Sequence, residues 1–585
     1  MKTLANNSSQ KENLKNQYSF KSQLLKILIL VISGITGTLA FPEFNISFLA
    51  FVTIIPVFLI TRKQGYWRSI FYGYIWSYSY CVALFFWLRE IHIASPFILC
   101  LLLACFYMPL FLLNPLLRRR ILYPTKTLLA GYEEFSKDQV KWIRRLFYCS
   151  TLAAIWTISE WLRSWVLTGL PWNYLATTQW QNIAFIQICE YTGIWGVSFL
   201  IAFVNFALVE DYSSIKKMIQ NKTFKTKTLP YTIITALILI TTNYIFGYIS
   251  EKNVRSKYET TTDKEIVKFG VVQGDLSQRR NANATMALEA IYRYITLTKT
   301  LRLKHPEIDV VVWPESATPM PYNIGGQLGH TFQIELFNLI CQVKKPFLIG
   351  AMYLDDYVSP RQYKMLNSVL LFDVGSKIKS RYDKIHIVPF GEYVPAREYL
   401  PKFLLKIIDM GRDLKAGTNY SPLELKDNVF IGVNICFEDV FPKISRKEAQ
   451  LGANVLLTVS NDAWYPKSSE PTQHLANSIF RSIETRLPMV RNGNNSSSVL
   501  VSPTGEVIDS VFNDGKGNMY VKKRGQGVRQ FTVNITKKPQ HSFYTRYGDI
   551  FIWFCWAILI TAIAVTISKM YQFAKHCDDI MKKIN

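Results

Sequence analysis

The chain has 585 residues, a formal net charge of +25, and 49% apolar and 14% aromatic residues. This length is too great for one domain, and the apolar residues gather toward the two ends while the middle resembles a soluble protein. A strong positive charge is typical of nucleic-acid-binding proteins, but here it lies in short loops between apolar segments, which argues against that class. The nine cysteines form no C-x-x-C pair, so neither a zinc site nor a disulfide framework is indicated.

Eight apolar segments follow a polar tail at residues 1–23. A hydrocarbon core of about 30 Å needs ~20 helical residues, and the second segment is the shortest of the eight. The first has no small-residue cleavage site before Pro42, so we interpret it as a retained span rather than a signal peptide. The expected spans are 24–41, 46–60, 70–88, 94–117, 146–167, 191–209, 231–249 and 550–568.

Every second loop between these segments is rich in Lys and Arg, whereas no Lys or Arg occurs between Trp165 and Lys216. The positive-inside rule then places both termini in the cytoplasm and the long segment before the last span outside it. The sequence predicts a membrane domain over 24–249, an outer domain over 250–548, a span over 549–568 and a tail over 569–585. The basic residues concerned are Lys11, Lys15, Lys21, Arg62, Lys63, Arg68, Arg118, Arg119, Arg120, Lys141, Arg144, Arg145, Lys216, Lys217, Lys222, Lys225, Lys227, Lys569, Lys575, Lys582 and Lys583.

The outer segment alternates apolar runs with helical patterns, and no internal repeat is evident. This order predicts an α/β domain whose strands are largely buried and whose helices cover the outer faces. The expected strands are 266–272, 309–313, 346–352, 368–372, 429–435, 455–460 and 498–501, and the expected helices are 285–303, 333–343 and 474–487.

One of these strands ends in a cysteine. Cys436 follows the apolar run 431–435 where the chain turns, with Glu438 and Asp439 close behind. A rigid strand end that faces a cleft is a suitable place for a nucleophile. Most cysteines in such a setting are small buried hydrophobic residues, so the interpretation depends on charged residues elsewhere in the domain.

Those charged residues follow other apolar runs. Glu315 comes after the strand 309–313, and Lys384 and Glu392 lie close to apolar residues in the stretch 382–395. Taken singly, Glu315 could cap the start of a helix, and Lys384 could be a solvated surface residue. His474 suggests a Cys–His pair, but its place at the start of a helix favours local hydrogen bonding.

Five segments resemble the carbon–nitrogen hydrolase (nitrilase) superfamily, and more narrowly its membrane-bound apolipoprotein N-acyltransferase family. They are 313–316 (WPES), 383–384 (DK), 389–395 (PFGEYVP), 435–438 (ICFE) and 460–464 (SNDAW). The segment 160–172 of the membrane domain and the segment 272–275 of the outer domain resemble that family too. The resemblance leaves out the N-terminal tail and a polar insert at 121–140. It implies an α-β-β-α sandwich beside a polytopic helical membrane domain, and a Glu-Lys-Cys triad made of Glu315, Lys384 and Cys436.

The implied reaction moves an acyl chain from a phospholipid to Cys436, and then to the amine of a diacylglyceryl-cysteine at a lipoprotein N-terminus. Lys384 is expected to lower the pKa of the Cys436 thiol, while Glu315 takes its proton. Lys384 and the backbone N–H of Phe437 would stabilise the oxyanion. The resemblance further implies a bacterial inner membrane location with a periplasmic catalytic domain, and we expect no cofactor, metal or nucleic acid.

The remaining residues are assigned supporting roles or left open. Glu392 is expected to hold Lys384 or a cleft loop, and Glu438 either lines the site or pairs with a basic neighbour. Phe437 replaces a tyrosine that is frequent in the family, and residues 277–281 lack a tryptophan frequent after the segment 272–275. Aromatic residues such as Tyr393 and Trp464 are expected on closing loops at 392–395 and 464–466, or else in simple packing.

Two other functions compete with this one. A membrane-anchored amidase could use the same triad on a small soluble amide, and a transporter or receptor could retain the outer domain for binding alone. The complete triad argues against the second of these. The many spans and the tryptophan-rich stretch 161–172 favour a lipid over a soluble substrate.

Overall fold

The computed structural model describes residues 21–122, 142–221, 229–277, 284–359, 362–401, 413–465, 467–514, 516, 519, 521 and 524–584. The chain forms two compact units. The first consists of residues 1–178, 195–242 and 551–585, and the second of residues 179–194 and 243–550. Expectations about the tail at 1–20, most of the insert at 121–140, the loop at 222–228, residues 278–281 and Pro466 fall outside the described residues.

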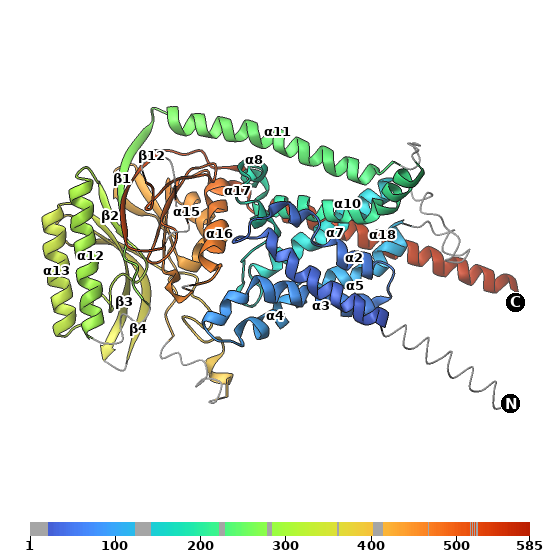
Figure 1. Ribbon diagram of the computed structural model, residues 1–585, viewed down its shortest axis with the longest axis horizontal. Helices are drawn as coiled ribbons and strands as arrows, with labels where there is room; N and C mark the ends of the chain where they lie inside the picture. The colour runs from blue at the N-terminus through green and yellow to red at the C-terminus, as the bar shows by residue number, and fades with distance from the viewer. Residues whose placement is uncertain are drawn as a thin grey trace. The chain divides into compact units, whose positions relative to one another are not determined.

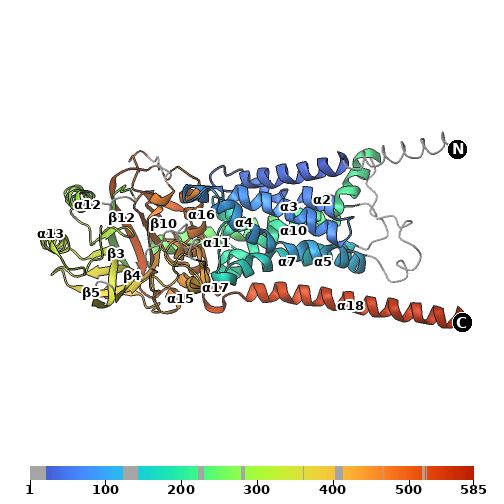
Figure 2. The same cartoon turned by 90° about the horizontal axis from the view of Figure 1, so that it is seen from below.

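The first unit is helical, because its sequence consists of long apolar runs whose backbone groups can all be paired within a helix. Figure 2 shows α3, α5, α7 and α10 side by side. After a helical run from Lys21 to Ala40, the helices are α2 (Ile55–Thr61), α3 (Tyr66–Leu84), α4 (Ser95–Cys105), α5 (Met108–Leu117), α7 (Trp142–Arg163), α10 (Ile194–Asn221), the first part of α11 (Tyr231–Thr260) and α18 (Ile550–Ile584).

Five helices in the described part of the chain are long and apolar enough to cross a membrane: Lys21–Ala40, Ser95–Leu122, Ile194–Tyr212, Tyr231–Thr260 and Ile550–Lys582. They coincide with the first, fourth, sixth, seventh and eighth expected spans. The second expected span is a shorter apolar helix, Ser47–Thr61. The third and fifth correspond to α3, which is rich in Tyr and Ser, and to α7, which carries Arg and Glu. The count of eight spans therefore stays a prediction.

Some of the basic residues that set the expected topology also form ion pairs in the first unit. Arg118 pairs with Glu210, and Arg145 lies 3.3 Å from Asp211, at the end of the sixth expected span. Asp211 also accepts hydrogen bonds from the first turn of α11, at the backbone nitrogen atoms of Thr232 and Ile233. These arginines thus stabilise helix ends as well as carrying charge.

The second unit contains two six-stranded sheets (Figure 1). In the first sheet the order is β12-β1-β2-β3-β4-β5, with β1, β2 and β3 parallel and the others antiparallel. The first-sheet strands are β1 (Lys264–Gln273), β2 (Val310–Trp313), β3 (Phe347–Ser359), β4 (Gln362–Phe372), β5 (Ile378–Asp383) and β12 (Gly527–Thr536).

The second sheet repeats this plan with three parallel strands at its centre. Its order is β11-β10-β9-β8-β7-β6, in which β7, β8 and β9 are parallel. Its strands are β6 (Leu423–Lys426), β7 (Val429–Ile435), β8 (Val455–Ser460), β9 (Met489–Gly493), β10 (Val499–Val501) and β11 (Val507–Ser510).

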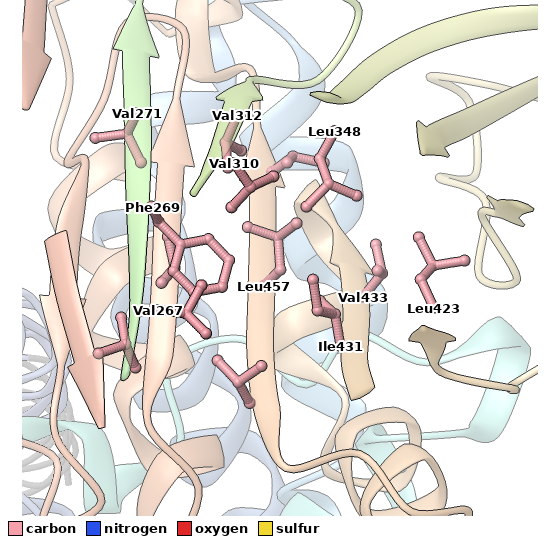
Figure 3. Close-up of a cluster of buried hydrophobic side chains, with 14 of the residues drawn as sticks. Val267, Phe269, Val271, Val310, Val312, Leu348, Leu423, Ile431, Val433 and Leu457 are labelled. Carbon is pink, nitrogen blue, oxygen red and sulfur yellow. The ribbon is translucent and has the colours of Figure 1, made fainter. Parts of the chain in front are cut away.

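The two sheets face each other across an apolar core (Figure 3). Val267, Phe269 and Val271 of β1 meet Ile431 and Val433 of β7 and their neighbours in this cluster. The alternation of side chains along a strand explains why every second residue belongs to it. Burial of this surface supplies the main stabilisation of the domain.

Helices cover the outer faces of both sheets, so the layers run α-β-β-α. Apolar faces of α12 (Ala284–Lys304) and α13 (Gln327–Val343) pack on the first sheet. On the second sheet lie α15 (Pro442–Gln450) and α16 (Glu470–Thr485), as Figure 1 shows. The second unit also holds α8 (Ile183–Ile186), α9 (Cys189–Thr192), the rest of α11 and α17 (Phe543–Tyr547).

The expected strands and helices all occur, but several elements were not expected. β5, β6, β9, β11, β12 and α15 are additional, and α13 begins at Gln327 rather than at residue 333. The extra strands lie at sheet edges or carry polar residues, as in β9, where Arg491 and Asn492 interrupt the apolar pattern. Short or polar strands leave little hydrophobic periodicity in a sequence.

Candidate active site

The nucleophile candidate stands at a sharp turn between a strand and a short helix. β7 is almost wholly buried and ends at Ile435, and Cys436 opens the 3-10 helix Cys436–Val440. The φ angle of Cys436 is +52°, a left-handed conformation that residues other than glycine adopt infrequently. Strained conformations of this kind cluster at functional sites, where the surrounding fold holds them in place.

Glu315 reaches the same place from the other sheet. It follows β2, and its carboxyl group lies close enough to Cys436 for its negative charge to raise the pKa of the thiol. One oxygen of that carboxyl, Oε1, lies 2.7 Å from Nδ2 of Asn367 in β4. Burial raises the pKa of Glu315, which Lys384 and the hydrogen bonds oppose. A carboxyl with a raised pKa can both take and return a proton near neutral pH.

Lys384 follows β5 and is held between two carboxylates. Its Nζ atom lies 2.8 Å from Oε1 of Glu392 and 3.6 Å from Oε1 of Glu315. Only 1% of its side chain is exposed. Burial by itself would lower the pKa of Lys384, but the negative charges of Glu392 and Glu315 outweigh it and raise the pKa. The ammonium group therefore stays charged inside the protein.

Glu392 makes the contacts expected of a support for the lysine and its loop. Besides Lys384, its Oε1 atom accepts a hydrogen bond from Asn367 at 3.1 Å, and its Oε2 atom accepts one from the backbone of Val388 at 2.7 Å. Asn367 thus bridges Glu315 and Glu392. Sequence reasoning missed this asparagine, since a single amide within the apolar strand β4 gives no signal of its own.

Glu438 links the loop after Lys384 to the end of β7. Its carboxyl oxygens accept hydrogen bonds from the backbone of Ile385 at 2.6 Å, His386 at 3.0 Å and Ile435 at 2.8 Å, and from the Tyr382 hydroxyl at 3.2 Å. The residue is fully buried, and burial raises its pKa to about 7 against the pull of these donors. Glu438 consequently ties the loop after Lys384 to the end of the nucleophile strand.

The Cys436 thiol itself is not acidified in this environment. Burial raises the pKa of Cys436 well above its usual value, Glu315 raises it further, and Lys384 opposes them without prevailing. The expected lowering by Lys384 is therefore present but outweighed. The thiol keeps its proton at rest, so a base such as Glu315 must remove it during attack.

A group of acidic and basic side chains lies buried beside the turn. Asp462, Glu470 and His474 have ligand atoms within 4.8 Å of one another, a spacing that could hold a metal ion. Both ring nitrogens of His474 already face aspartates, and the Arg491 guanidinium lies 3.6 Å from Asp462. His474 and Arg491 therefore place positive charge beside these carboxylates.

Comparison with known proteins shows which family this chain resembles. The model of the apolipoprotein N-acyltransferase N-terminal domain matches residues 33–207, and the carbon-nitrogen hydrolase model matches residues 269–522. The chain belongs to the apolipoprotein N-acyltransferase family. An apolipoprotein N-acyltransferase from Geobacter metallireducens is 27% identical over 92% of this chain and 95% of its own length. Another, from Rickettsia prowazekii, is 25% identical over 83% of this chain and 88% of its own.

One solved structure, a carbon-nitrogen hydrolase from Helicobacter pylori G27, is also similar. It is 17% identical, covers 46% of this chain and 89% of its own, and has a TM-score of 0.32.

Several aromatic residues lie near the candidate active site. The Phe437 ring packs edge-on against Phe441 at 5.0 Å, and His386 lies 3.8 Å from Phe441 between ring centroids. Phe390 and Trp464 are instead largely exposed, at 56% and 59%. Large exposed aromatic side chains on loops of a catalytic domain are suited to contact with apolar partners.

Proposed function

We propose that this chain transfers a fatty acyl chain from a phospholipid to the N-terminal amine of diacylglyceryl-cysteine in an apolipoprotein, through a thioester on Cys436. The observation that carries the proposal is the meeting of Glu315 and Lys384, at the ends of first-sheet strands, with Cys436 at the end of a second-sheet strand. Membership of the apolipoprotein N-acyltransferase family supports the choice of acyl donor and acceptor.

In the first half-reaction, Glu315 takes the thiol proton as the sulfur of Cys436 attacks the ester carbonyl carbon. The resulting oxyanion is stabilised by the Lys384 ammonium and by the backbone N–H of Phe437. When the intermediate collapses, the C–O bond breaks and Glu315 gives its proton to the departing alkoxide. A lysophospholipid leaves, and the acyl chain stays on the sulfur.

In the second half-reaction, the neutral α-amine of the acceptor attacks the thioester carbonyl. The same two donors stabilise the second oxyanion, and Glu315 takes a proton from the amine nitrogen. The C–S bond then breaks, the amide is released, and the Cys436 sulfur regains a proton from Glu315. A thioester suits this exchange because an amine attacks it more readily than it attacks an oxygen ester.

We place this reaction on the periplasmic side of a bacterial inner membrane, in an outer domain over 250–548 that lies between seven spans and an eighth. The alternation of basic and bare loops supports this topology and puts both termini in the cytoplasm. A membrane domain with several spans is suited to an acyl donor that enters the site from the bilayer. Exposed Trp464 lies on the loop 464–466 and exposed Phe390 lies just before the loop 392–395, the two loops that would shield the thioester from water.

The decisive experiment looks for the acyl-enzyme. Protein incubated with phospholipid vesicles and no acceptor should accumulate a fatty-acyl mass on the peptide containing Cys436, and hydroxylamine should remove it. A peptide with a free N-terminal diacylglyceryl-cysteine should discharge the acyl group, and the same peptide with an acetylated amine should not. An unmodified Cys436 together with hydrolysis of small amides would instead establish an amidase.

A further inference from the structure

His474 of α16 is buried between two aspartates. Its Nε2 atom lies 2.9 Å from Oδ1 of Asp439, which belongs to the turn after Cys436, and its Nδ1 atom lies 3.2 Å from Oδ1 of Asp462, which follows β8. None of the three side chains is more than 1% exposed. A neutral imidazole has one N–H and one lone pair, so it can donate to only one of these carboxylates. Donation to both requires the imidazolium.

Charge balance leads to the same protonation state. Arg491 of β9 donates a hydrogen bond to Asp439 and lies 3.6 Å from Asp462, so two carboxylates face one guanidinium before His474 is counted. A positive His474 makes the buried group neutral, which avoids the large cost of an uncompensated buried charge. Burial lowers the pKa of His474, but Asp439 and Asp462 outweigh it and raise the pKa to about 10.

A third acid, Glu470, also faces the ring. Oε1 of Glu470 lies 3.6 Å from Nδ1 of His474, on the same helix. Burial and the nearby charge of Asp462 raise the pKa of Glu470 well above its usual value, which favours the neutral form of its carboxyl group.

The same imidazole nitrogen also contacts the backbone of the nucleophile. Nε2 of His474 lies 3.2 Å from the carbonyl oxygen of Cys436. That carbonyl and the N–H of Phe437 belong to one planar trans amide and point in opposite directions. A cation bound to the oxygen polarises the whole amide and strengthens its N–H as a donor, because hydrogen bonds in a chain reinforce each other.

We propose that the His474 imidazolium is a positioning residue that holds and polarises the peptide between Cys436 and Phe437, so that the Phe437 N–H can stabilise the oxyanion. The inference rests on the proposed function, in which that N–H is a donor. It also explains how the left-handed turn at Cys436 keeps its orientation, since the carbonyl is anchored by a side chain of α16.

The test compares two reactions of the same sulfur in the full-length membrane protein. Transfer of an acyl chain from phospholipid vesicles to Cys436 passes through an oxyanion, whereas alkylation of Cys436 by iodoacetamide displaces iodide from a saturated carbon and does not. In His474→Gln the rate of acylation should fall by about 100-fold, the scale of losing one oxyanion donor. The rate of alkylation should change by less than ~3-fold, since it depends on the thiolate fraction.

His474→Gln leaves a buried carboxylate without its cation, so a second variant guards against misfolding. In His474→Gln/Asp462→Asn the buried charges again balance, and the loss of acylation should persist because no cation contacts the Cys436 carbonyl. His305→Gln, at a partly buried histidine that makes no contact described for this site, is the matched control and should acylate at the wild-type rate.

Acylation within twofold of wild type in either His474 variant would overturn the proposal, as would restoration by Asp462→Asn. A parallel fall of alkylation and acylation would also overturn it, because it would mean that Cys436 itself had moved. If the wild-type protein hydrolyses amides but takes no acyl chain from phospholipid, the proposed function fails instead. The same variants are then compared on amide hydrolysis, which also forms an oxyanion.

Discussion

Lys384 carries a full charge inside the domain, and it does so because Glu392 and Glu315 lie 2.8 and 3.6 Å from its Nζ atom. The balance is asymmetric: Glu392 is the closer partner and is itself bound to the backbone of Val388. Glu315 therefore has a looser contact to the lysine, and its charge raises the pKa of the Cys436 thiol. Of the two acids, Glu315 is the one to which the proposed mechanism assigns the proton transfer.

Substitutions at the three proposed catalytic residues should lower acyl transfer, whereas a substitution at a cysteine elsewhere should not. Cys436→Ala should abolish acyl transfer, while Cys341→Ala, in α13, should leave it nearly unchanged. Lys384→Met and Glu315→Gln should each lose at least ~100-fold, the scale of an oxyanion donor or a general base. The measurement is transfer of a labelled acyl chain to a diacylglyceryl-cysteine peptide, and full activity in Cys436→Ala would contradict the mechanism.

The pKa of His474 makes the stability of the domain depend on pH. It is about 10 in the folded protein, against an ordinary value of about 6.5, so the folded state binds more protons between these limits. The stabilisation is complete below pH 6.5 and is lost as the pH rises toward 10. The midpoint of thermal unfolding should accordingly fall over this range more steeply in wild type than in His474→Gln. Equal slopes in the two proteins would show that the histidine is neutral.

Sequence reasoning found the residues that end apolar strands, because a charged or nucleophilic side chain after a buried run stands out. It could not assign Glu438, whose partners are backbone N–H groups about fifty residues upstream. It also missed Asn367 and treated His474 as a local contact. The roles of these residues depend on contacts between elements that lie far apart in the sequence. A backbone N–H group can donate whatever its side chain is, so the sequence does not show which residues are the donors.

At the scale of elements, the close packing of β2 and β3 positions Glu315. A Cβ atom added at Gly350 in β3 would lie 2.3 Å from the carbonyl oxygen of Pro314 and 2.6 Å from the Cα atom of Glu315. These are backbone atoms, so they can make room only if the end of β2 shifts. The backbone N–H of Ala317 also donates to the Gly350 carbonyl at 2.8 Å.

Gly350→Ala should for this reason displace Glu315 and lower acyl transfer by at least ~10-fold, with an overpacking cost of about 1–3 kcal/mol in stability. Gly325→Ala is the matched control, because its added Cβ would have no heavy atom within 4 Å. Both variants can be assayed for acyl transfer and for thermal unfolding. A fully active Gly350→Ala protein would show that β2 tolerates the shift.

The elements that sequence reasoning predicted are those with a strong apolar period, such as β1, β7 and α12. The edge strands β6, β11 and β12 pack on one face only, and β9 places Arg491 among buried residues. Each therefore lacks the continuous apolar run by which the central strands were identified. The helix α3 was expected from the sequence, but its Tyr and Ser side chains dilute the apolar pattern.

At the scale of the whole molecule, the distribution of charge predicts orientation. A reporter that is active only outside the cytoplasm should be active when fused after Lys268 and silent when fused after Lys225, which precedes the seventh expected span. The ion pairs of Arg118 and Arg145 do not weaken this expectation, because the positive-inside rule counts arginines in cytoplasmic loops whether or not they form ion pairs. The opposite pair of results would overturn the proposed topology.

The proposed triad is divided between two sheets, with Glu315 and Lys384 on one and Cys436 on the other, and this division has a consequence for how the enzyme matures. Each sheet has its own ladder of hydrogen bonds, and the proposed catalytic groups meet only where the apolar faces dock. Reactivity should therefore require a chain in which the two sheets have docked. A chain whose sheets have not docked does not bring the base and the nucleophile together, so we expect that it does not cleave the phospholipids of the bilayer.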